Sequence, residues 1–248
     1  MSEHIADISS VRAKTKAARF KPLPDGVESI AAVVAEALAY LESHLAAGFK
    51  AHRSQQSLTR RGSELTQSIQ LRLGSGNLSG VSVEVSAYAA VRSSKFKSWC
   101  SSEGTGYARD LLWSRQVGYL GGANDYIKWQ LGDKLHRAAE LNDLCLTLQT
   151  TALPSLDAWA TKEAIATAVF RRTELDRIDW LMEAALWSGA TATAERLLGE
   201  HLLANPQQVA DCALELARFR SSGGATPLPS AISGAAYLAV RYGLSLPQ

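Results

Sequence analysis

The stretch that decides the fold is residues 65–91, which read LTQSIQLRLGSGNLSGVSVEVSAYAAV. Every second position in two runs is apolar, with Gln67 as the one polar exception. The first run is Leu65, Ile69, Leu71 and Leu73, and the second is Val81, Val83, Val85, Ala87, Ala89 and Val91. A glycine-rich segment, residues 74–80, separates the runs. Alternation of this kind predicts two antiparallel strands with one buried face. The pair excludes an all-helical repeat protein.

Two shorter strands are expected downstream of this pair. Residues 111–120 are rich in branched and aromatic side chains, and residues 126–131 follow a glycine-containing turn. Between the second and third strands, serine-rich residues 92–106 are expected to hold a short helix near residues 95–100. Because the links are short, we predict an antiparallel meander of three to four strands.

Helices are expected on both sides of the sheet in sequence. Residues 27–47 have apolar positions at helical spacing, with Asp25 and Glu28 as a capping-box pair and Gly48 as the stop. Further helices are expected over residues 133–151, 154–169, 173–187, 191–203, 206–219 and 231–241. The fold class is therefore α+β. We predict a basic arm (1–24), an α+β domain (25–153) and a subdomain of antiparallel helix pairs (154–248).

Composition indicates an ordinary globular chain. Of the 248 residues, 46% are hydrophobic and 20% are charged, and the net charge is +2, which is too balanced to indicate nucleic-acid binding. The local exception is the arm from Arg12 to Lys21, with five positive charges. Three scattered cysteines argue for reduced thiols. No apolar run reaches the length of a membrane span, so we expect a cytoplasmic protein without membrane contact.

The middle of the chain resembles a bacterial domain-of-unknown-function family of small α+β proteins over about residues 28–156. The motifs that carry the resemblance are Gly48-Phe49-Lys50, Arg60-Arg61, the two alternating strands, Gly118-Tyr119-Leu120, the Asp125–Trp129 pair and Leu153-Pro154. The resemblance implies an α+β fold and no established activity. Some bacterial proteins of this general type look like immunity or antitoxin partners, which favours that class.

No motif for catalysis, nucleotide binding or metal binding is found. The glycine pairs at residues 74–76 and 104–106 lack a third glycine and a lysine, and no two histidines have the i, i+4 spacing of a helical metal site. We therefore expect no cofactor and no metal. Three acidic residues, Asp176, Asp179 and Glu183, share one helical stripe. With Arg171, Arg172 and Arg177 beside them, a solvated, salt-bridged helix face is the preferred interpretation.

Arginines, aromatic residues and the acidic stripe supply the candidate partner-binding residues. Arginine beside tyrosine and tryptophan is the mixture enriched at interfaces. In the second strand of the pair, Glu84, Tyr88 and Arg92 lie on the polar face, as does Arg72 in the first. The full candidate set is Arg60, Arg61, Arg72, Glu84, Tyr88, Arg92, Arg115, Asp176, Asp179 and Glu183.

These observations favour a non-catalytic protein-binding module, most concretely an immunity-, antitoxin- or adaptor-type protein whose partner is another protein, a toxin being one candidate. The alternative is a hydrolytic or phosphate-handling enzyme that uses Arg60, Arg61 and the acidic stripe. Binding of nucleic acid through the basic arm is a third hypothesis. The sequence favours the first hypothesis because it contains no catalytic constellation.

Overall fold

The computed structural model describes residues 26–45, 48–121, 124–170, 177–222 and 226–245. The first half contains helix α2 (Ile30–His44), strands β1 (Lys50–His52), β2 (Ser57–Arg61), β3 (Thr66–Leu73) and β4 (Glu84–Arg92), helix α3 (Ser94–Ser102), and strands β5 (Leu111–Gln116) and β6 (Trp129–Gln130). The second half contains helices α4 (Arg137–Thr147), α5 (Leu153–Asp157), α6 (Lys162–Phe170), α7 (Ile178–Trp187), α8 (Thr191–Ala204), α9 (Val209–Ser222) and α10 (Ala231–Arg241). The predicted α+β class is confirmed.

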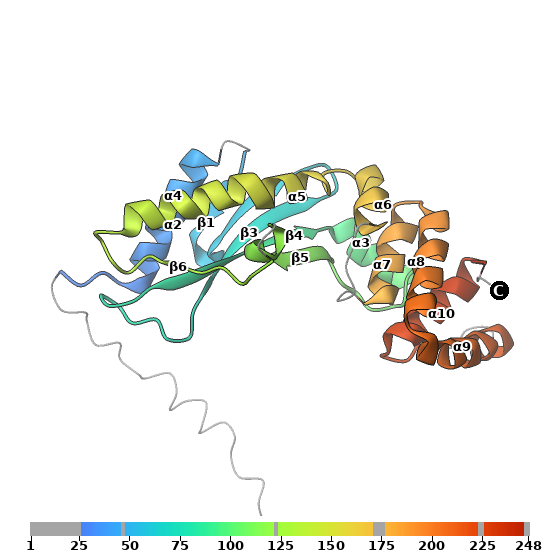
Figure 1. The fold of residues 1–248 in the computed structure, drawn as a ribbon. Coiled ribbons are helices and arrows are strands. Elements are labelled where there is room, and N and C mark those ends of the chain that lie inside the picture. The colour runs from blue at the N-terminus through green and yellow to red at the C-terminus, as the bar shows by residue number, and fades with distance from the viewer. Residues whose placement is uncertain (1–25, 46–47, 122–123, 171–176, 223–225, 246–248) are drawn as a thin grey trace, which may run out of the picture.

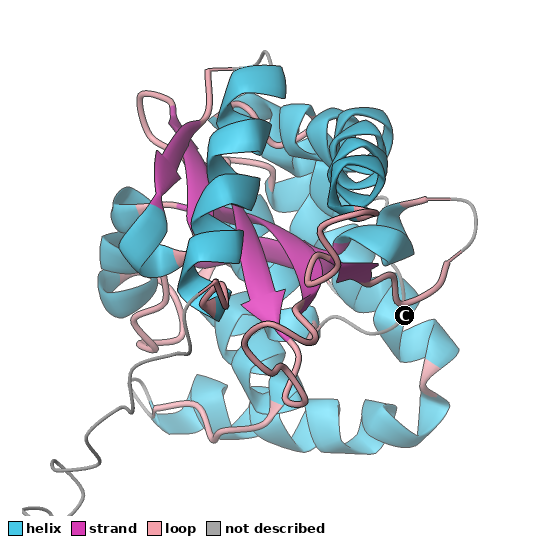
Figure 2. Cartoon of the chain, turned by 90° about the vertical axis from the view of Figure 1, so that its left-hand side faces the viewer, coloured by secondary structure: helices cyan, strands magenta, loops and turns pink. Residues whose placement is uncertain are grey.

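The described strands form one antiparallel sheet in the order β1-β2-β3-β4-β5, with β6 paired to the start of β4. Helices α2, α4 and α5 cover one face of this sheet, and helices α6–α10 pack together beyond its β5 end (Figure 1). In the view turned by 90° the strands cross the middle of the molecule, partly overlapped by one helix (Figure 2). Among the residues that the structure describes, no helix covers the opposite face of the sheet.

The alternating pair forms two antiparallel strands, as predicted, and β1 and β2 on its other side place the pair at the centre of the sheet. Ile69 of β3 pairs with Ala89 of β4, and both side chains are fully buried beneath the helices. Two of the apolar positions that were expected inside lie outside instead. Leu73 is 37% exposed at the last position of β3, and Val81 is 72% exposed in the turn. An inward-pointing side chain is buried only where a helix covers the strand. No described helix covers Leu73 or Val81, so both remain exposed.

Two strands of the sheet, β1 and β2, were not predicted from the sequence. They are three and five residues long, and their outward positions are polar, so they lack the apolar alternation that identified β3 and β4. The predicted third strand is shorter than expected, because the chain turns into a 3-10 helix at Val117–Leu120. The predicted fourth strand is reduced to the two residues of β6.

The helices agree well with the sequence, with two corrections. The N-cap of α2 is Ser29, whose hydroxyl accepts a hydrogen bond from the Ala32 amide, whereas Asp25 lies outside the described residues. The helix expected to begin at Pro154 is continuous with α4 through a π-helical turn at Leu148–Ala152. Proline cannot donate the backbone bond of a helix interior, and the wider turn just before it accommodates that loss.

Helix α5 lies on the sheet rather than with the C-terminal helices. The Gln67 side chain on β3 donates a 2.5 Å hydrogen bond to the Leu156 carbonyl, and Arg60 of β2 forms an ion pair with Asp157. The predicted domain boundary after residue 153 therefore falls inside a continuous helical run that packs against β2 and β3.

Candidate functional site

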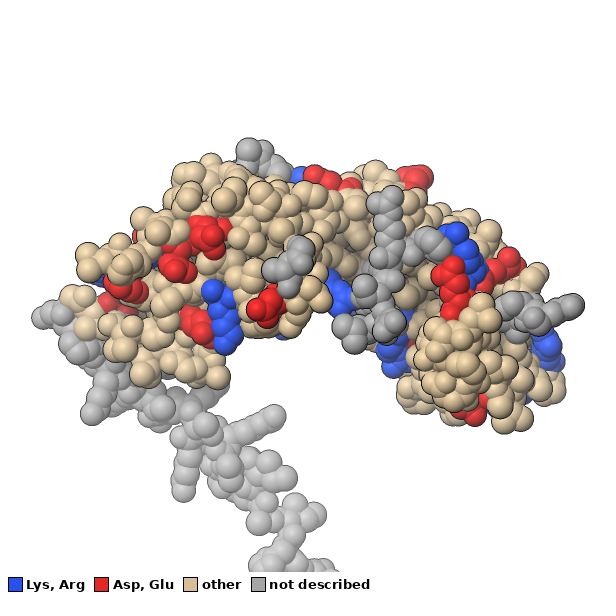
Figure 3. Space-filling model, in the orientation of Figure 1, with Lys and Arg blue, Asp and Glu red and all other residues tan. Residues whose placement is uncertain are grey.

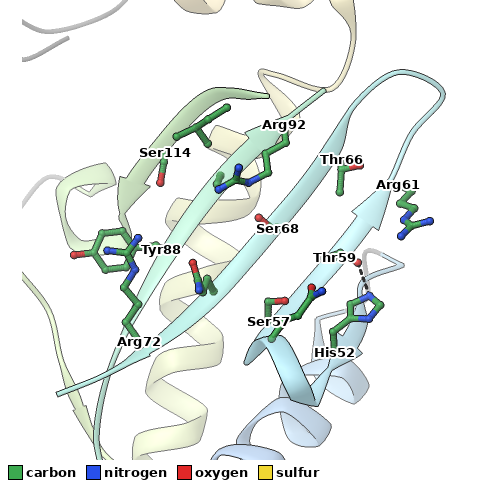
Figure 4. A pocket seen from close by; sticks show the side chains of 14 residues that line it. His52, Ser57, Thr59, Arg61, Thr66, Ser68, Arg72, Tyr88, Arg92 and Ser114 are labelled. Carbon is green, nitrogen blue, oxygen red and sulfur yellow. Dashed lines mark hydrogen bonds between the residues drawn. The ribbon is translucent and has the colours of Figure 1, made fainter. Parts of the chain in front are cut away.

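A polar depression occupies the open face of the sheet. Its volume is about 590 Å³, and Figure 4 shows it from the open side, with the covering helices behind the strands. Most of its lining side chains lie at alternate positions of neighbouring strands, and Gln55 comes from the 3-10 helix between β1 and β2. The described lining is His52, Gln55, Ser57, Thr59, Arg61, Thr66, Ser68, Gln70, Arg72, Tyr88, Ala90, Arg92, Leu111 and Ser114, and it contains no aspartate or glutamate.

Small side chains form the floor of the depression. The strand register aligns Thr59 of β2 with Ser68 of β3, Ser68 with Ala90 of β4, and Ala90 with Ser114 of β5. At about 4.8 Å between neighbouring strands, this row is roughly 14 Å long and runs across the sheet. Because none of these side chains is large, the floor is a trough that another polypeptide backbone can approach closely.

Larger side chains stand on both sides of the trough. On one side, Arg61, Thr66 and Arg92 form the neighbouring cross-strand row. On the other side, Gln70 pairs with Tyr88, and Arg72 follows one step further along β3. Thr66 and Gln70 are four residues apart on β3, so the two walls are about 13 Å apart at their Cα atoms.

The wall at Arg72 is fixed by its aromatic neighbours. The Arg72 guanidinium carbon lies 4.0 Å from the centroid of the Tyr88 ring, a cation–π contact. The Tyr88 hydroxyl donates to the Tyr126 hydroxyl at 3.5 Å, and Tyr126 donates to the Ser86 hydroxyl at 3.0 Å. The hydrogen bond to Tyr126, together with partial burial, raises the pKa of the Tyr88 hydroxyl above its usual value.

The site is positively charged. Arg92 forms an exposed ion pair with Asp110 at 2.7 Å, so its charge is partly neutralised. Arg61 is exposed and forms no ion pair with any residue that the structure describes. His52 contacts the Thr59 hydroxyl through Nε2 at 2.7 Å, which orients the imidazole at the β1 end of the trough. Three guanidinium groups therefore surround a lining without a carboxylate.

Of the candidates named from sequence, Arg61, Arg72, Tyr88 and Arg92 line this depression. Glu84 lies on the same face beyond Arg72, where it forms an ion pair with Lys128 at 2.9 Å. The polar face of the alternating pair is thus one continuous surface.

Two other arginine candidates lie on the covered face of the sheet. Arg60 alternates with Arg61 on β2, so its side chain points toward the helices, where it contacts the Phe49 ring and Asp157. Arg115 alternates with Ser114 on β5 and pairs with the buried Ala89 of β4. Neither side chain belongs to the depression, because adjacent residues of a strand point to opposite faces.

The acidic stripe differs from the expected solvated face. Asp179 and Glu183 on α7 are both buried, and Asp176 lies outside the described residues. The Glu183 carboxylate accepts hydrogen bonds from the amide and hydroxyl of Thr105, each at 2.7 Å, and forms an ion pair with Arg109. Asp179 pairs with Arg177 at 2.9 Å. The pairing of Arg177 with Asp179 agrees with the interpretation, the partner of Glu183 is instead Arg109, and Arg171 and Arg172 lie outside the described residues. The expected solvent exposure of Asp179 and Glu183 is wrong, because α7 packs against α3 and the loop that follows it.

The residues of the depression that were not named as candidates from the sequence include His52 of β1 and the floor residues Thr59, Ser68 and Ser114. The alternation that revealed the buried positions of β3 also carries Ser68 and Gln70 on its other face. Once β2 is recognised, the same rule places Thr59 and Arg61 beside them. The polar positions of the alternating pattern were therefore the sequence feature that could have revealed the depression.

Among the described residues, no group of three or more His, Cys, Asp or Glu side chains could hold a metal ion. Within the same residues, no helix is both long and apolar enough to cross a membrane. The chain matches no family model, no curated protein and no solved structure. The resemblance noted for residues 28–156 therefore stays an expectation, and function must be argued from the open sheet face itself.

Proposed function

We propose that this chain is a non-catalytic protein-binding module that receives another protein on the open face of its sheet. The observation that carries the proposal is the uncovered trough, with a floor of small side chains, three of the four with a hydroxyl, and arginine at both walls. In the space-filling view the molecule is arched, and its concave side is the side away from α2 and α4 (Figure 3). The open sheet face and helices α6–α10 beside it, which we call the helical block, together offer a large surface to a partner.

The more specific proposal is a cytoplasmic immunity-, antitoxin- or adaptor-type protein. Three free and buried cysteines are typical of a reducing compartment. The enzymatic alternative has less support, because it required Arg60, Arg61 and the acidic stripe to meet. Arg60 and Arg61 lie on opposite faces of the sheet, and Asp179 and Glu183 are buried in ion pairs.

A variant that fills the trough tests the proposal. Ser68→Tyr places a large side chain on the floor at a strand position that accepts tyrosine. Ala217→Tyr is the matched control, because Ala217 is exposed on α9. Tagged wild-type protein and both variants are used to capture partners from cells that express the gene. We expect a protein that is retained by the wild type and by Ala217→Tyr and is lost with Ser68→Tyr.

Two results would contradict the proposal. One is capture of the same proteins by all three forms, which would place binding away from the trough. The other is a wild-type protein that captures no partner and hydrolyses a nucleotide or an ester in a broad substrate screen. Circular dichroism of each variant checks that the fold is retained.

A further inference from the structure

We infer that the segment received by the trough is an acidic, extended stretch of the partner protein, laid across strands β2 to β5. This inference rests on the proposed function and adds the chemistry and the conformation of the bound segment.

The floor favours an extended backbone over a helix. Among the described residues, the hydroxyls of Ser68 and Ser114 have no hydrogen-bond partner. Each can donate one hydrogen bond and accept others. The backbone groups of a helix are already paired with one another, whereas those of an extended segment are free to bond to such hydroxyls. At about 3.3 Å per residue, the 14 Å floor accommodates roughly four extended residues.

The arginines favour carboxylates on both sides of the segment. Figure 4 shows Arg61 and Arg92 toward one side of the floor and Arg72 beside Tyr88 toward the other, with the three guanidinium groups apart from one another. A single small anion would need the guanidinium groups to converge on one point. Adjacent side chains of an extended segment point to opposite sides, so consecutive acidic residues would meet both walls.

The charges around the trough disfavour two other occupants. The chain's own N-terminal arm carries five positive charges between Arg12 and Lys21, so it does not complement an arginine-walled site. Sites for single-stranded nucleic acid combine a positive groove with aromatic faces on which bases stack. The described lining contains two rings, and both are already engaged: the Arg72 guanidinium lies over Tyr88, and His52 contacts the Thr59 hydroxyl.

The test uses the full chain and two defined peptides. One is a capped hexapeptide of alternating aspartate and glutamate, and the other is the same peptide with asparagine and glutamine. Because exposed ion pairs are individually weak, we expect a dissociation constant near the millimolar range, which suits an NMR titration of the ¹⁵N-labelled protein. The acidic peptide should shift the amides of Ser68 and Ser114 and the Nε–H signals of Arg61, Arg72 and Arg92.

Charge-reversal variants test whether the wall arginines bind the acidic peptide. Arg61→Glu should weaken the acidic peptide at least threefold, whereas Arg220→Glu on exposed α9 should not change its affinity. Raising the salt concentration from 50 to 300 mM should also weaken binding, since the ion pairs are exposed. Equal shifts with the amide peptide, or shifts confined to α6–α10, would overturn the inference.

Two comparisons separate this inference from the proposed function. If Ser68→Tyr abolishes partner capture but the acidic peptide shifts no signal in the trough, the protein-binding proposal stands and the acidic segment is wrong. If a thymidine hexanucleotide shifts the trough signals at lower concentration than the acidic peptide, both the acidic segment and the protein partner are contradicted. Shifts with the acidic peptide that Arg61→Glu weakens support the inference.

Discussion

At the scale of single residues, Arg137 shows how one buried cation joins two helices. Its side chain is 7% exposed, and its guanidinium donates to Glu28 at 2.8 Å, to Glu36 of α2 at 2.5 Å and to the Leu131 carbonyl at 2.8 Å. Glu28 lies just before α2 and Glu36 lies within it, whereas Arg137 is the first residue of α4. The contacts therefore join the start of α4 to α2, and Arg137 fixes the position of α2 over the sheet.

Replacing Arg137 should lower the stability of the folded protein. We expect Arg137→Met to lower the free energy of unfolding by about 2 kcal/mol, because the variant loses charged hydrogen bonds and leaves the Leu131 carbonyl without its donor. The control is Lys134→Met, which removes an exposed and longer ion pair to the same Glu28 at 3.4 Å. That change should cost less than about 1 kcal/mol. Urea unfolding at pH 7 measures both, and equal losses would contradict the assigned role.

The same contact predicts a pH dependence. The hydrogen bond from Arg137 lowers the pKa of the Glu28 carboxyl below its ordinary value of 4.5. A carboxyl with a lowered pKa stabilises the folded state above its unfolded pKa and loses that effect as the pH falls through the folded pKa. The difference in stability between wild type and Arg137→Met should therefore be largest above pH 5 and should narrow below pH 4. A difference that stays constant down to pH 3 would exclude Glu28 as the titrating partner.

The cysteines give a second prediction at this scale. Cys100, Cys145 and Cys212 are all buried, and burial raises the pKa of each thiol. Since the thiolate is the reactive form, we expect almost no reaction with a thiol reagent at pH 8 in the folded protein. Three equivalents should react after denaturation. Rapid modification of a thiol in the folded protein would show that its site opens to solvent.

At the scale of elements, a buried ion pair joins α7 to the segment that links α3 and β5. Glu183 is fully buried, and its partners Thr105 and Arg109 lie 78 and 74 residues away in the chain. The Arg109 guanidinium also lies 4.6 Å from the centroid of the Trp180 ring on α7. Gly104 is required at this point, because an added Cβ would lie 2.6 Å from the Glu183 carboxylate and 2.9 Å from the Cys100 Cα atom.

Neutralising this carboxylate should destabilise the fold. Glu183→Gln leaves the Arg109 cation largely buried without its counter-charge, and we expect a loss of about 3 kcal/mol at pH 7. Glu103→Gln is the matched control, since the Glu103–Arg241 pair at 2.9 Å also joins α3 to the C-terminal helices but is exposed. It should cost less than about 1 kcal/mol. Thermal unfolding followed by circular dichroism compares the two, and equal losses would contradict the role of burial.

The elements also show how far the sequence alone could lead. The strands β3 and β4 and most of the helices were predictable, because their apolar periodicity is long enough to identify both the element and its buried face. The strands β1 and β2 were not, because three and five residues with polar outward positions give no period. The pairing of Glu183 with Arg109 was not predictable either: helical spacing places Asp179 and Glu183 on one stripe but does not show what packs against it. The trough also needs β1 and β2 on the β3 side of the pair and β5 on the β4 side. Without β1 and β2, it could not be predicted in full.

At the scale of the whole molecule, aromatic contacts connect the sheet to the C-terminal helices. Trp113 of β5 lies 6.0 Å from Trp159, Phe96 of α3 lies 5.4 Å from Trp187 of α7, and Trp99 lies 6.1 Å from Tyr242, all between ring centroids. These contacts and the buried Glu183–Arg109 pair are continuous with one hydrophobic core. The helical block is therefore held beside the trough as a fixed part of the same molecule.

A single cooperative unfolding transition follows from this continuity. Tryptophan fluorescence reports mainly on the junction, since Trp99, Trp113, Trp159 and Trp187 all lie there and the chain has six tryptophans. Far-ultraviolet circular dichroism reports on helices throughout the chain. If the sheet and helices α6–α10 separated, each would expose apolar side chains that are now buried between them. The fluorescence and circular dichroism signals should therefore change at the same urea concentration. A fluorescence transition at lower urea than the loss of helix would show that helices α6–α10 detach from the sheet before they unfold, and would contradict a single cooperative unit.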